Sequence, residues 1–238
     1  MGRIVSVRGC PGDSWAATCA DLLADALGEG LAETGRATLA GAGGSTPAPI
    51  YRQLARADLD WSAVTVTLVD ERYVPETSDQ SNAALIRREL MQGRAAAVDL
   101  VPLYHPQVTV DRAALIASRE LATRSPRLDA VLLGMGEDGH ICSMFPTSPT
   151  LPTLLMPGLA PAVLGVPSGR DGLAPPQERL TLNLPWLMTA RRIVLALTGH
   201  RKRQVFEQQA AGDPRTQPIA ALLAAGVNLN VLWTEQLP

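Results

Sequence analysis

The sequence predicts an α/β protein with three layers, in which helices cover both faces of a mostly parallel sheet. Short apolar runs rich in β-branched residues, such as residues 64–69, alternate along the chain with segments of helical periodicity. This alternation is typical of a parallel sheet covered on both faces. With 46% apolar residues among 238, the chain has enough hydrophobic side chains for a sizeable core.

The expected elements follow one another along the chain. Residues 14–33 place Trp15, Cys19, Leu23 and Leu27 on one helical face. Further helices are expected from Pro47, because proline suits the first turn, from the possible caps at 81–82, and at 112–123, 201–211 and 218–225. Strands are expected at 36–41, 64–69, 130–133, 179–183, 193–198 and 227–233. The proline-rich residues 146–178 are expected to be mostly loop, and without a visible linker we expect one domain over 1–238.

Composition and charge exclude several classes of function. A formal net charge of −2 gives no basic footprint of the kind that nucleic-acid binding needs. No run approaches the roughly 18 apolar residues of a membrane helix, and no signal-peptide core is visible. Cys10, Cys19 and Cys142 are odd in number and lack C-x-x-C spacing, so we expect reduced thiols in a cytoplasmic protein. An anionic ligand must therefore be held by a local cluster of cations.

Four unusual segments each follow a predicted strand directly. Ligands of open α/β sheets bind outside the carboxyl ends of the strands, so we expect the four segments to meet. In the first, at 41–47, Gly43, Gly44, Ser45 and Thr46 offer backbone N–H groups and hydroxyls to an anion at a helix N-terminus. An ordinary turn capped by Ser or Thr is the alternative. The spacing fits neither a Walker loop nor a dinucleotide fingerprint, which argues against a nucleotide.

The second segment is Asp70-Glu71-Arg72, at the end of the predicted strand 64–69. Arginine suits bidentate recognition of a phosphate. A carboxylate beside it either orients the guanidinium or takes part in acid–base chemistry. A solvated ion pair is the alternative.

The third and fourth segments carry a histidine and a group of cations. LGMGEDGH at 133–140 places His140 among glycines that leave its ring accessible, and imidazole titrates near neutral pH. We therefore expect His140 to be catalytic, and His105, in a proline-flanked loop, to be structural. Arg201, Lys202 and Arg203 open a helix, where cations face the positive end of the helix dipole. An anionic ligand would remove that conflict, and a solvated basic face is the alternative.

Together these segments resemble the 6-phosphogluconolactonase family, which is related to the glucosamine-6-phosphate deaminases. The matching stretches are GGSTP at 43–47, DERYVP at 70–75, SN at 81–82, LGMGEDGH at 133–140, SMFP at 143–146, PPQERLTLNLP at 175–185 and TGHRKRQVF at 198–206. They occur in the family's order from about residue 14 to residue 233. Five departures from the family pattern leave every charged group in place: Ala42, Ile141, Cys142, Met144 and Asn183. We expect the changes to alter the shape of the pocket and to make Cys142 sensitive to oxidation.

The resemblance implies a modified Rossmann-like fold and a single catalytic domain. It also implies hydrolysis of 6-phospho-D-glucono-1,5-lactone to 6-phosphogluconate, the second step of the pentose phosphate pathway, with no metal or organic cofactor. The expected partner is a small-molecule sugar phosphate, with neither nucleic acid nor membrane. A monomer and a homodimer both stay open.

Roles for individual residues follow from the same resemblance and from their chemistry. We expect His140 to be the general base, Asp138 to orient its ring, and Asp70 to be the competing base. We expect the phosphate to bind in the loop 43–46 with Arg72 and Lys202, and Arg179 is a weaker candidate. No residue is expected to hold a metal.

Two other functions remain as alternatives. Deaminases carry a glutamate five positions after the equivalent histidine, where this chain has Phe145, and they usually read Asp-Glu-Tyr where it has Asp-Glu-Arg at 70–72. Both differences disfavour amine chemistry. A non-catalytic sugar-phosphate sensor on the same fold is the alternative from a different class, but it would be expected to lose the titratable residues that this chain keeps.

Overall fold

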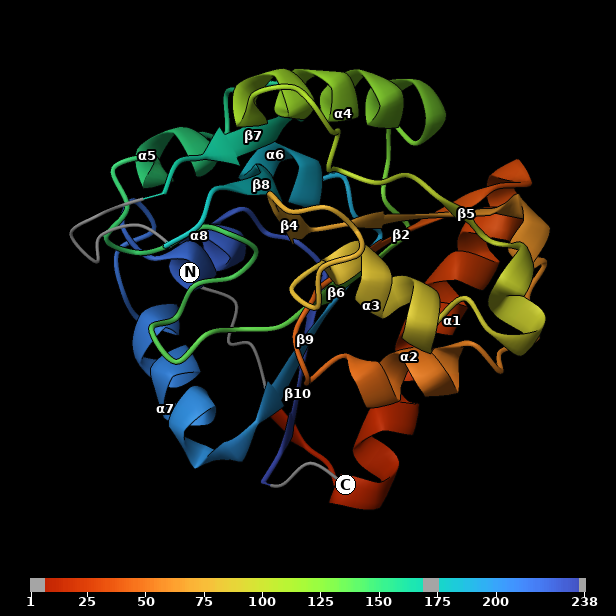
Figure 1. Cartoon of the computed structure of the whole chain (residues 1–238). Helices are drawn as coiled ribbons and strands as arrows, with labels where there is room; N and C mark the ends of the chain where they lie inside the picture. Colours follow the sequence, from red (N-terminus) through yellow and green to blue (C-terminus); the bar gives the residue numbers. More distant parts are fainter. Residues whose placement is uncertain (1–6, 169–175, 236–238) are drawn as a thin grey trace.

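A seven-stranded parallel sheet forms the centre of the structure, a computed structural model that describes residues 7–168 and 176–235 (Figure 1). The strand order is β1-β10-β9-β6-β2-β3-β5. The bounds are β1 (Val7–Gly9), β2 (Ala37–Gly41), β3 (Val64–Leu68), β5 (Asp99–Leu100), β6 (Ala130–Leu133), β9 (Arg192–Thr198) and β10 (Leu229–Thr234). The four inner strands β9, β6, β2 and β3 are almost wholly buried, which explains their continuous apolar runs.

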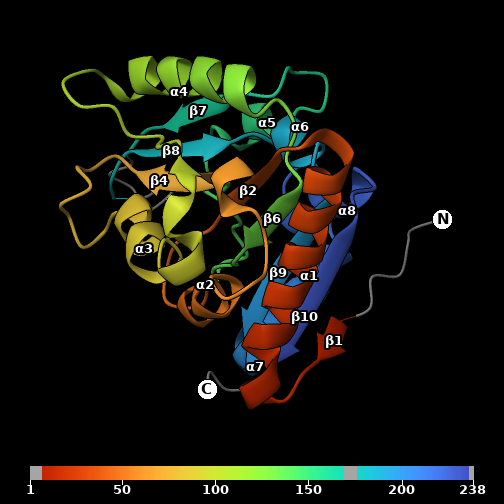
Figure 2. The same cartoon turned by 90° about the vertical axis from the view of Figure 1, so that its right-hand side faces the viewer.

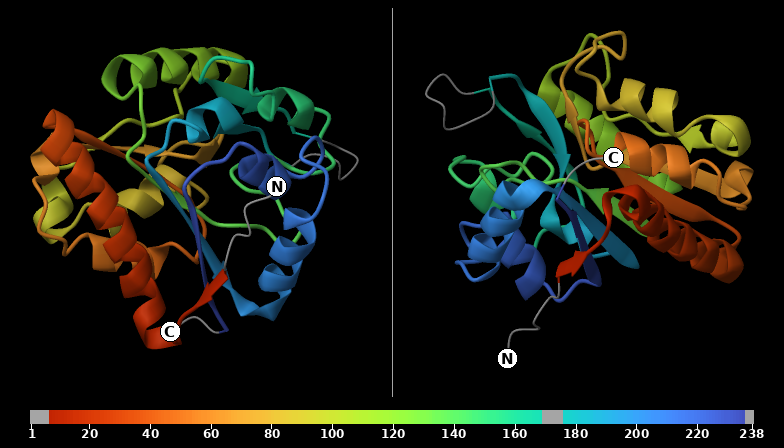
Figure 3. Two further views of the ribbon diagram at one scale, coloured as in Figure 1. Left: turned by 180° about the vertical axis from the view of Figure 1, so that it is seen from behind. Right: turned by 90° about the horizontal axis from the view of Figure 1, so that it is seen from below.

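Helices cover both faces of this sheet, so the predicted three-layer α/β class is confirmed. Figures 1 and 3 show α1 and α2 on one side of the sheet and α7 and α8 on the other. The helices are α1 (Gly12–Thr34), α2 (Ala48–Leu54), α3 (Asn82–Glu89), α4 (Val110–Arg124), α5 (Leu151–Leu154), α6 (Leu184–Leu187), α7 (Gly199–Ala210) and α8 (Pro218–Ala224), with 3-10 turns at Trp61–Ala63 and Gly93–Ala97.

The longest helix, α1, forms as its sequence pattern predicts. Trp15, Cys19, Leu23 and Leu27 are fully buried against the sheet. The helix ends at Gly35, whose φ of 72° lies in the left-handed region that glycine adopts without strain, and whose N–H bonds to the Leu31 carbonyl.

A second, three-stranded antiparallel sheet corrects part of the sequence prediction. It contains β4 (Asp70–Arg72), β8 (Arg179–Leu182) and β7 (Val163–Val166), and α4 covers it (Figure 2). The strand expected at 179–183 is therefore not part of the parallel sheet. β7 also lies in a segment that was expected to be loop. A run of four residues between Pro161 and Pro167 is too short for its alternation to be recognised in the sequence.

The ends of several predicted elements differ from the structure. α7 begins at Gly199, two residues before the expected start, so Arg201 and Lys202 lie in its first turn and Arg203 follows directly. β10 spans Leu229–Thr234, shifted toward the C-terminus. The short edge strands β1 and β5 were not predicted, because two or three residues carry too little pattern.

A few expectations fall outside the described residues. The structure does not describe residues 169–175, which include Pro175 at the start of one resembling stretch and part of the proline-rich segment. It also does not describe residues 1–6. Within the part of the chain that the structure describes, no helix has the length and apolar character needed to cross a bilayer.

Candidate active site

The carboxyl ends of four neighbouring strands, β9, β6, β2 and β3, meet at one edge of the sheet, as the sequence predicts. The segments that follow them surround a cavity of about 220 Å³. Its lining contains nearly all the predicted site residues, together with several that were not predicted: Ala42, Gly43, Gly44, Ser45, Thr46, Val69, Asp70, Arg72, Asn82, Gly134, Met135, Gly136, His140, Cys142, Arg179 and Lys202. Asp138 is absent from this lining and contacts the cavity through His140.

The glycine-rich turn after β2 packs tightly against the start of α3. A Cβ atom on Gly43 would lie 1.8 Å from Oδ1 of Asn82, so only glycine leaves room for that side chain. Gly44 has a φ of 89°, which larger residues adopt only with strain. The N-cap of α2 is Pro47, without a side-chain hydrogen bond, so the alternative of a turn capped by Ser or Thr is wrong.

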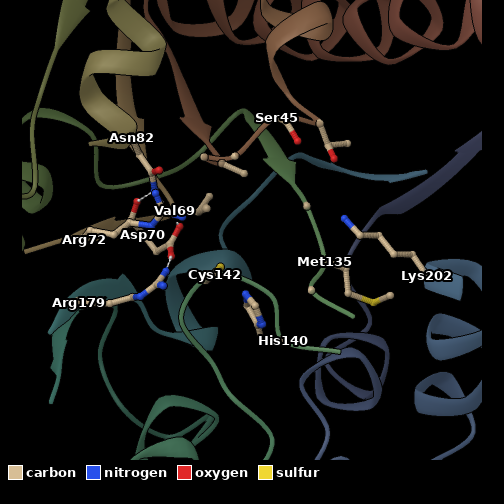
Figure 4. A pocket seen from close by; sticks show the side chains of 16 residues that line it. Ser45, Val69, Asp70, Arg72, Asn82, Met135, His140, Cys142, Arg179 and Lys202 are labelled. Atoms are coloured by element: carbon tan, nitrogen blue, oxygen red, sulfur yellow. Dashed lines mark hydrogen bonds and ion pairs between the residues drawn. The ribbon is translucent and has the colours of Figure 1, made fainter. Parts of the chain in front are cut away.

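Asp70 is held at the wall of the cavity, where it is only 6% exposed. Its Oδ2 accepts a hydrogen bond of 2.7 Å from Oγ of Ser143 and lies 3.7 Å from Nη1 of Arg179. Asn82 donates through Nδ2 to the Asp70 carbonyl at 2.9 Å and, at 3.4 Å, to Oδ1 (Figure 4). Both carboxylate oxygens therefore have partners before any ligand binds.

Glu71 faces away from the cavity and organises the start of α3. Its Oε1 accepts from the N–H groups of Arg72 and Asn82, both at 2.8 Å, and its Oε2 accepts from the Ala83 N–H at 2.8 Å and from Oγ of Ser81 at 3.1 Å. Burial raises the pKa of Glu71, while the backbone hydrogen bonds act against that shift. The alternative of a solvated ion pair is therefore wrong for Glu71, which is fully buried and instead fixes Asn82 at the cavity.

Arg72 and Arg179 lie directly opposite each other on the antiparallel strands β4 and β8. Within the described residues, Nε of each is buried without a hydrogen-bond partner. Burial lowers the pKa of Arg179 and the charge of Arg72 lowers it further, whereas Asp70 acts in the opposite direction. Like charges in this position repel. A bound anion in the cavity that both residues line would offset that repulsion.

His140 is coupled to Asp138 by a short contact of 2.6 Å between its Nδ1 and Oδ1 of the carboxylate. A Cβ atom on Gly136 would lie 2.3 Å from Nδ1 of His140 and 2.4 Å from Oδ1 of Asp138, so this glycine makes room for the pair. Partial burial raises the pKa of Asp138, but the hydrogen bond and charge of His140 outweigh it and leave the pKa below its ordinary value. The carboxylate thus stays ionised beside the ring.

An aromatic ring also contacts the imidazole. The ring centroids of His140 and Phe145 are 4.4 Å apart with an interplanar angle of 37°. Cζ of Arg179 lies 5.6 Å from the centroid of the same phenyl ring, a cation–π distance. Phe145 therefore provides an apolar contact to both groups and adds no charge beside His140.

Lys202 reaches the cavity from the first turn of α7. In Figure 4 its side chain points inward from the side opposite Asp70, Arg72 and Arg179. Its neighbour Arg203 instead pairs with Glu207 at 2.9 Å. No ion pair between Lys202 and a carboxylate occurs in the described part of the chain.

The composition of the sequence contains a further signal for Lys202, which the motifs alone did not reveal. Lys202 is the only lysine in the chain, and every other basic side chain among the 21 lysines and arginines is an arginine. A chain that uses arginine everywhere else keeps a compact ammonium group at the cavity.

Asn82, Ser143 and Cys142 were not predicted as site residues. Asn82 was expected only as a helix cap, and Ser143 only as part of the SMFP stretch. Cys142 has a φ of 52°, uncommon outside glycine, and is 7% exposed. Burial and the charge of Asp70 raise the pKa of its thiol well above the ordinary value. Burial and the raised pKa both act against the expected sensitivity of Cys142 to oxidation, because the thiolate is the reactive form.

This chain is similar to known proteins over most of its length. A family model described as glucosamine-6-phosphate isomerases/6-phosphogluconolactonase matches residues 12–233. A 6-phosphogluconolactonase of Rhizobium meliloti (strain 1021) is 41% identical over 220 residues, which cover 90% of this chain and 93% of the relative. The crystal structure of a 6-phosphogluconolactonase from Shewanella baltica OS155 is 32% identical, with a TM-score of 0.89, and the match covers 98% of this chain and 99% of that one.

A more distant structure shares the fold. It is a monomeric glucosamine-6-phosphate deaminase, 18% identical to this chain with a TM-score of 0.76, and the match covers 98% of each chain. This likeness is one of fold.

Proposed function

The chain belongs to the glucosamine-6-phosphate isomerase and 6-phosphogluconolactonase family, and we propose that it hydrolyses 6-phospho-D-glucono-1,5-lactone to 6-phosphogluconate, a step of the pentose phosphate pathway. The contact between His140 and Asp138 at the edge of a cation-lined cavity carries this proposal. A lactone is already an activated ester. Its hydrolysis needs a positioned water, a proton acceptor and stabilisation of charge at the carbonyl, all of which side chains provide.

The phosphate of the substrate binds in the loop 43–46, with Arg72 and Lys202 as its cations and Arg179 as a weaker candidate. Backbone N–H groups near Gly44 and the hydroxyls of Ser45 and Thr46 complete this subsite. Each charge-assisted hydrogen bond contributes about 1.5–3 kcal/mol. Holding this remote group places the lactone carbonyl beside the catalytic water.

His140 acts as the general base. With Asp138 ionised, Nδ1–H donates to the carboxylate, which leaves the lone pair on Nε2 free to accept a proton. Water attacks C1 of the lactone while its proton passes to Nε2. The tetrahedral intermediate then collapses, the bond between C1 and the ring oxygen breaks, and the imidazolium of His140 returns the proton to that oxygen. Asp138 stabilises the imidazolium between these two steps.

The surroundings of Asp70 argue against it as the base. Its carboxylate is engaged by Ser143, Asn82 and Arg179. Both carboxylate oxygens are therefore already occupied by partners from the protein itself. Its role in this proposal is to hold Arg179 at the wall of the cavity.

Phe145 argues against amine chemistry at the same site. The resemblance described above places a glutamate at this position in the deaminases, where it supports opening of the sugar ring. The phenyl ring of Phe145 packs against His140 and carries no proton to transfer. Lactone hydrolysis needs no second acid there, because water is the nucleophile.

A coupled assay tests the proposal. Freshly prepared lactone is added to the purified protein, and a dehydrogenase specific for 6-phosphogluconate reports the product. Because the lactone also hydrolyses spontaneously, the expected result is acceleration over that background, and His140→Ala prepared in the same way is the control. A folded wild-type protein that gives only the background rate would overturn the proposal. Release of ammonium from glucosamine 6-phosphate would instead support the deaminase branch.

A further inference from the structure

A second cavity, of about 490 Å³, lies at the ends of α2 and α3 opposite to those that face the catalytic cavity. It opens between the C-terminal ends of α2 and α3, which pack against each other, and the 3-10 turn that follows α3. It shares no lining residue with the catalytic cavity. Four of the side chains around it are arginines: Arg52, Arg56, Arg88 and Arg94.

The carboxylates near this arginine cavity do not neutralise it. Nη1 of Arg52 lies 2.6 Å and Nε of Arg88 lies 2.9 Å from oxygens of one carboxylate, that of Glu89. Arg94 pairs with Asp58, whose side chain is 92% exposed. Arg56 donates only to Oε1 of Gln53, and among the described residues it makes no ion pair. Two positive charges thus remain around the cavity, in a chain whose net charge is −2.

A structural explanation covers only part of this cluster. Basic residues in the last turn of a helix interact favourably with its dipole. That applies to Arg52 in α2 and to Arg88 in α3. Arg56 and Arg94 lie beyond the ends of these helices, so the dipoles do not account for their approach to the same cavity.

We propose that this arginine cavity binds a small anion with two or more phosphoryl groups. The fork of donors on a guanidinium matches phosphate oxygens in a bidentate manner, and several such forks around one space favour a ligand with several phosphates. No aromatic side chain is among the described residues that line it, so nothing there stacks on an exposed nucleobase. The chemistry therefore favours a compact polyphosphate group over single-stranded nucleic acid.

Calorimetric titration with pyrophosphate at low ionic strength tests this site. All proteins carry Lys202→Ala, which weakens anion binding in the catalytic cavity. The test variant adds Arg56→Ala and Arg94→Ala. The matched control adds Arg112→Ala and Arg119→Ala on α4, which remove the same charge from exposed positions elsewhere. All four arginines are exposed, so we expect every variant to fold with an unchanged circular dichroism spectrum.

The parent, which carries Lys202→Ala alone, is expected to bind one pyrophosphate and to bind it more tightly than inorganic phosphate. The test variant should lose affinity by about tenfold, because two guanidinium contacts to the phosphoryl oxygens are removed, and the control should stay within about twofold. Equal losses in both pairs would show non-specific attraction and overturn the site, as would a parent that binds nothing or a test variant that binds like the parent. The titration contains no lactone, so its outcome is independent of the proposed function. In the protein that keeps Lys202, the two arginine substitutions should leave whatever rate the coupled assay measures unchanged, because neither residue lines the catalytic cavity.

Discussion

Oδ1 of Asp138 lies 2.6 Å from Nδ1 of His140, and the backbone N–H of the same histidine donates to the same oxygen at 3.2 Å. The carboxylate therefore fixes both the ring and the turn that carries it. Gly136 is needed for this geometry, because a Cβ atom there would overlap both side chains.

His140→Ala should lower kcat by roughly 100- to 10,000-fold, the usual contribution of positioned proton transfer. The KM should change little, because the phosphate subsite is intact. Asp138→Asn should lower kcat less, since asparagine still accepts a hydrogen bond but does not stabilise an imidazolium. Steady-state kinetics with the coupled assay measure both. Wild-type turnover in His140→Ala would remove this residue from the mechanism.

Lys202→Ala should mainly weaken the binding of phosphorylated sugars. Loss of one charge-assisted contact predicts a decrease in affinity for 6-phosphogluconate of roughly ten- to a hundredfold. Lys202→Arg keeps the charge and should restore part of the affinity, limited by the bulk of the guanidinium in a cavity of about 220 Å³. Calorimetric titration with the product measures both variants. Wild-type affinity in Lys202→Ala would mean that the phosphate binds elsewhere.

Gly43→Ala should damage the site from a position that carries no chemistry. The new Cβ atom would overlap Asn82, whose Nδ2 holds Asp70. We expect a loss of about 1–3 kcal/mol in the free energy of unfolding together with a fall in kcat/KM. Gly158→Ala is the matched control, because a Cβ atom there has nothing within 4 Å. Equal urea midpoints and activities for the two variants would contradict the packing described here.

The buried thiol of Cys142 should make stability depend on alkaline pH. Burial raises its pKa in the folded protein above 9.0, the ordinary value, so the folded state keeps a proton that the unfolded state releases. The stabilising contribution of this buried thiol to the free energy of unfolding is fully present below pH 9.0 and is lost as the pH rises above it. Urea unfolding measured at about pH 8 and pH 10 gives the free energy of unfolding at each pH. Between these two pH values it should fall less for Cys142→Ala than for wild type. Cys19, whose pKa burial also raises, is still present in that variant and should leave part of the decrease.

The sequence predicts the main sheet well because its inner strands are buried on both faces. β2, β6 and β9 appear as continuous apolar runs, which have few other interpretations between helices. The small sheet was harder to predict. β4 follows β3 after a single residue, Val69, so one apolar run leads into strands of two different sheets. Pairing of β4 with a strand more than 100 residues later depends on contacts that no local pattern contains.

The site was predictable where a residue type carries its own chemistry. His140, Asp70 and Lys202 were predicted because each belongs to an unusual segment that directly follows a predicted strand, and all three line the same cavity. Asn82 and Ser143 were not, since neutral polar residues are common in turns and caps. Their importance arises from the fold, which brings both within hydrogen-bond distance of Asp70.

The orientation of the product in the catalytic cavity tests the central claim most directly. A crystal structure of the protein with bound 6-phosphogluconate should place the phosphate between Lys202 and the loop 43–46, and the C1 carboxylate within hydrogen-bond distance of Nε2 of His140. A product bound with its phosphate at His140, or bound outside this cavity, would contradict the account.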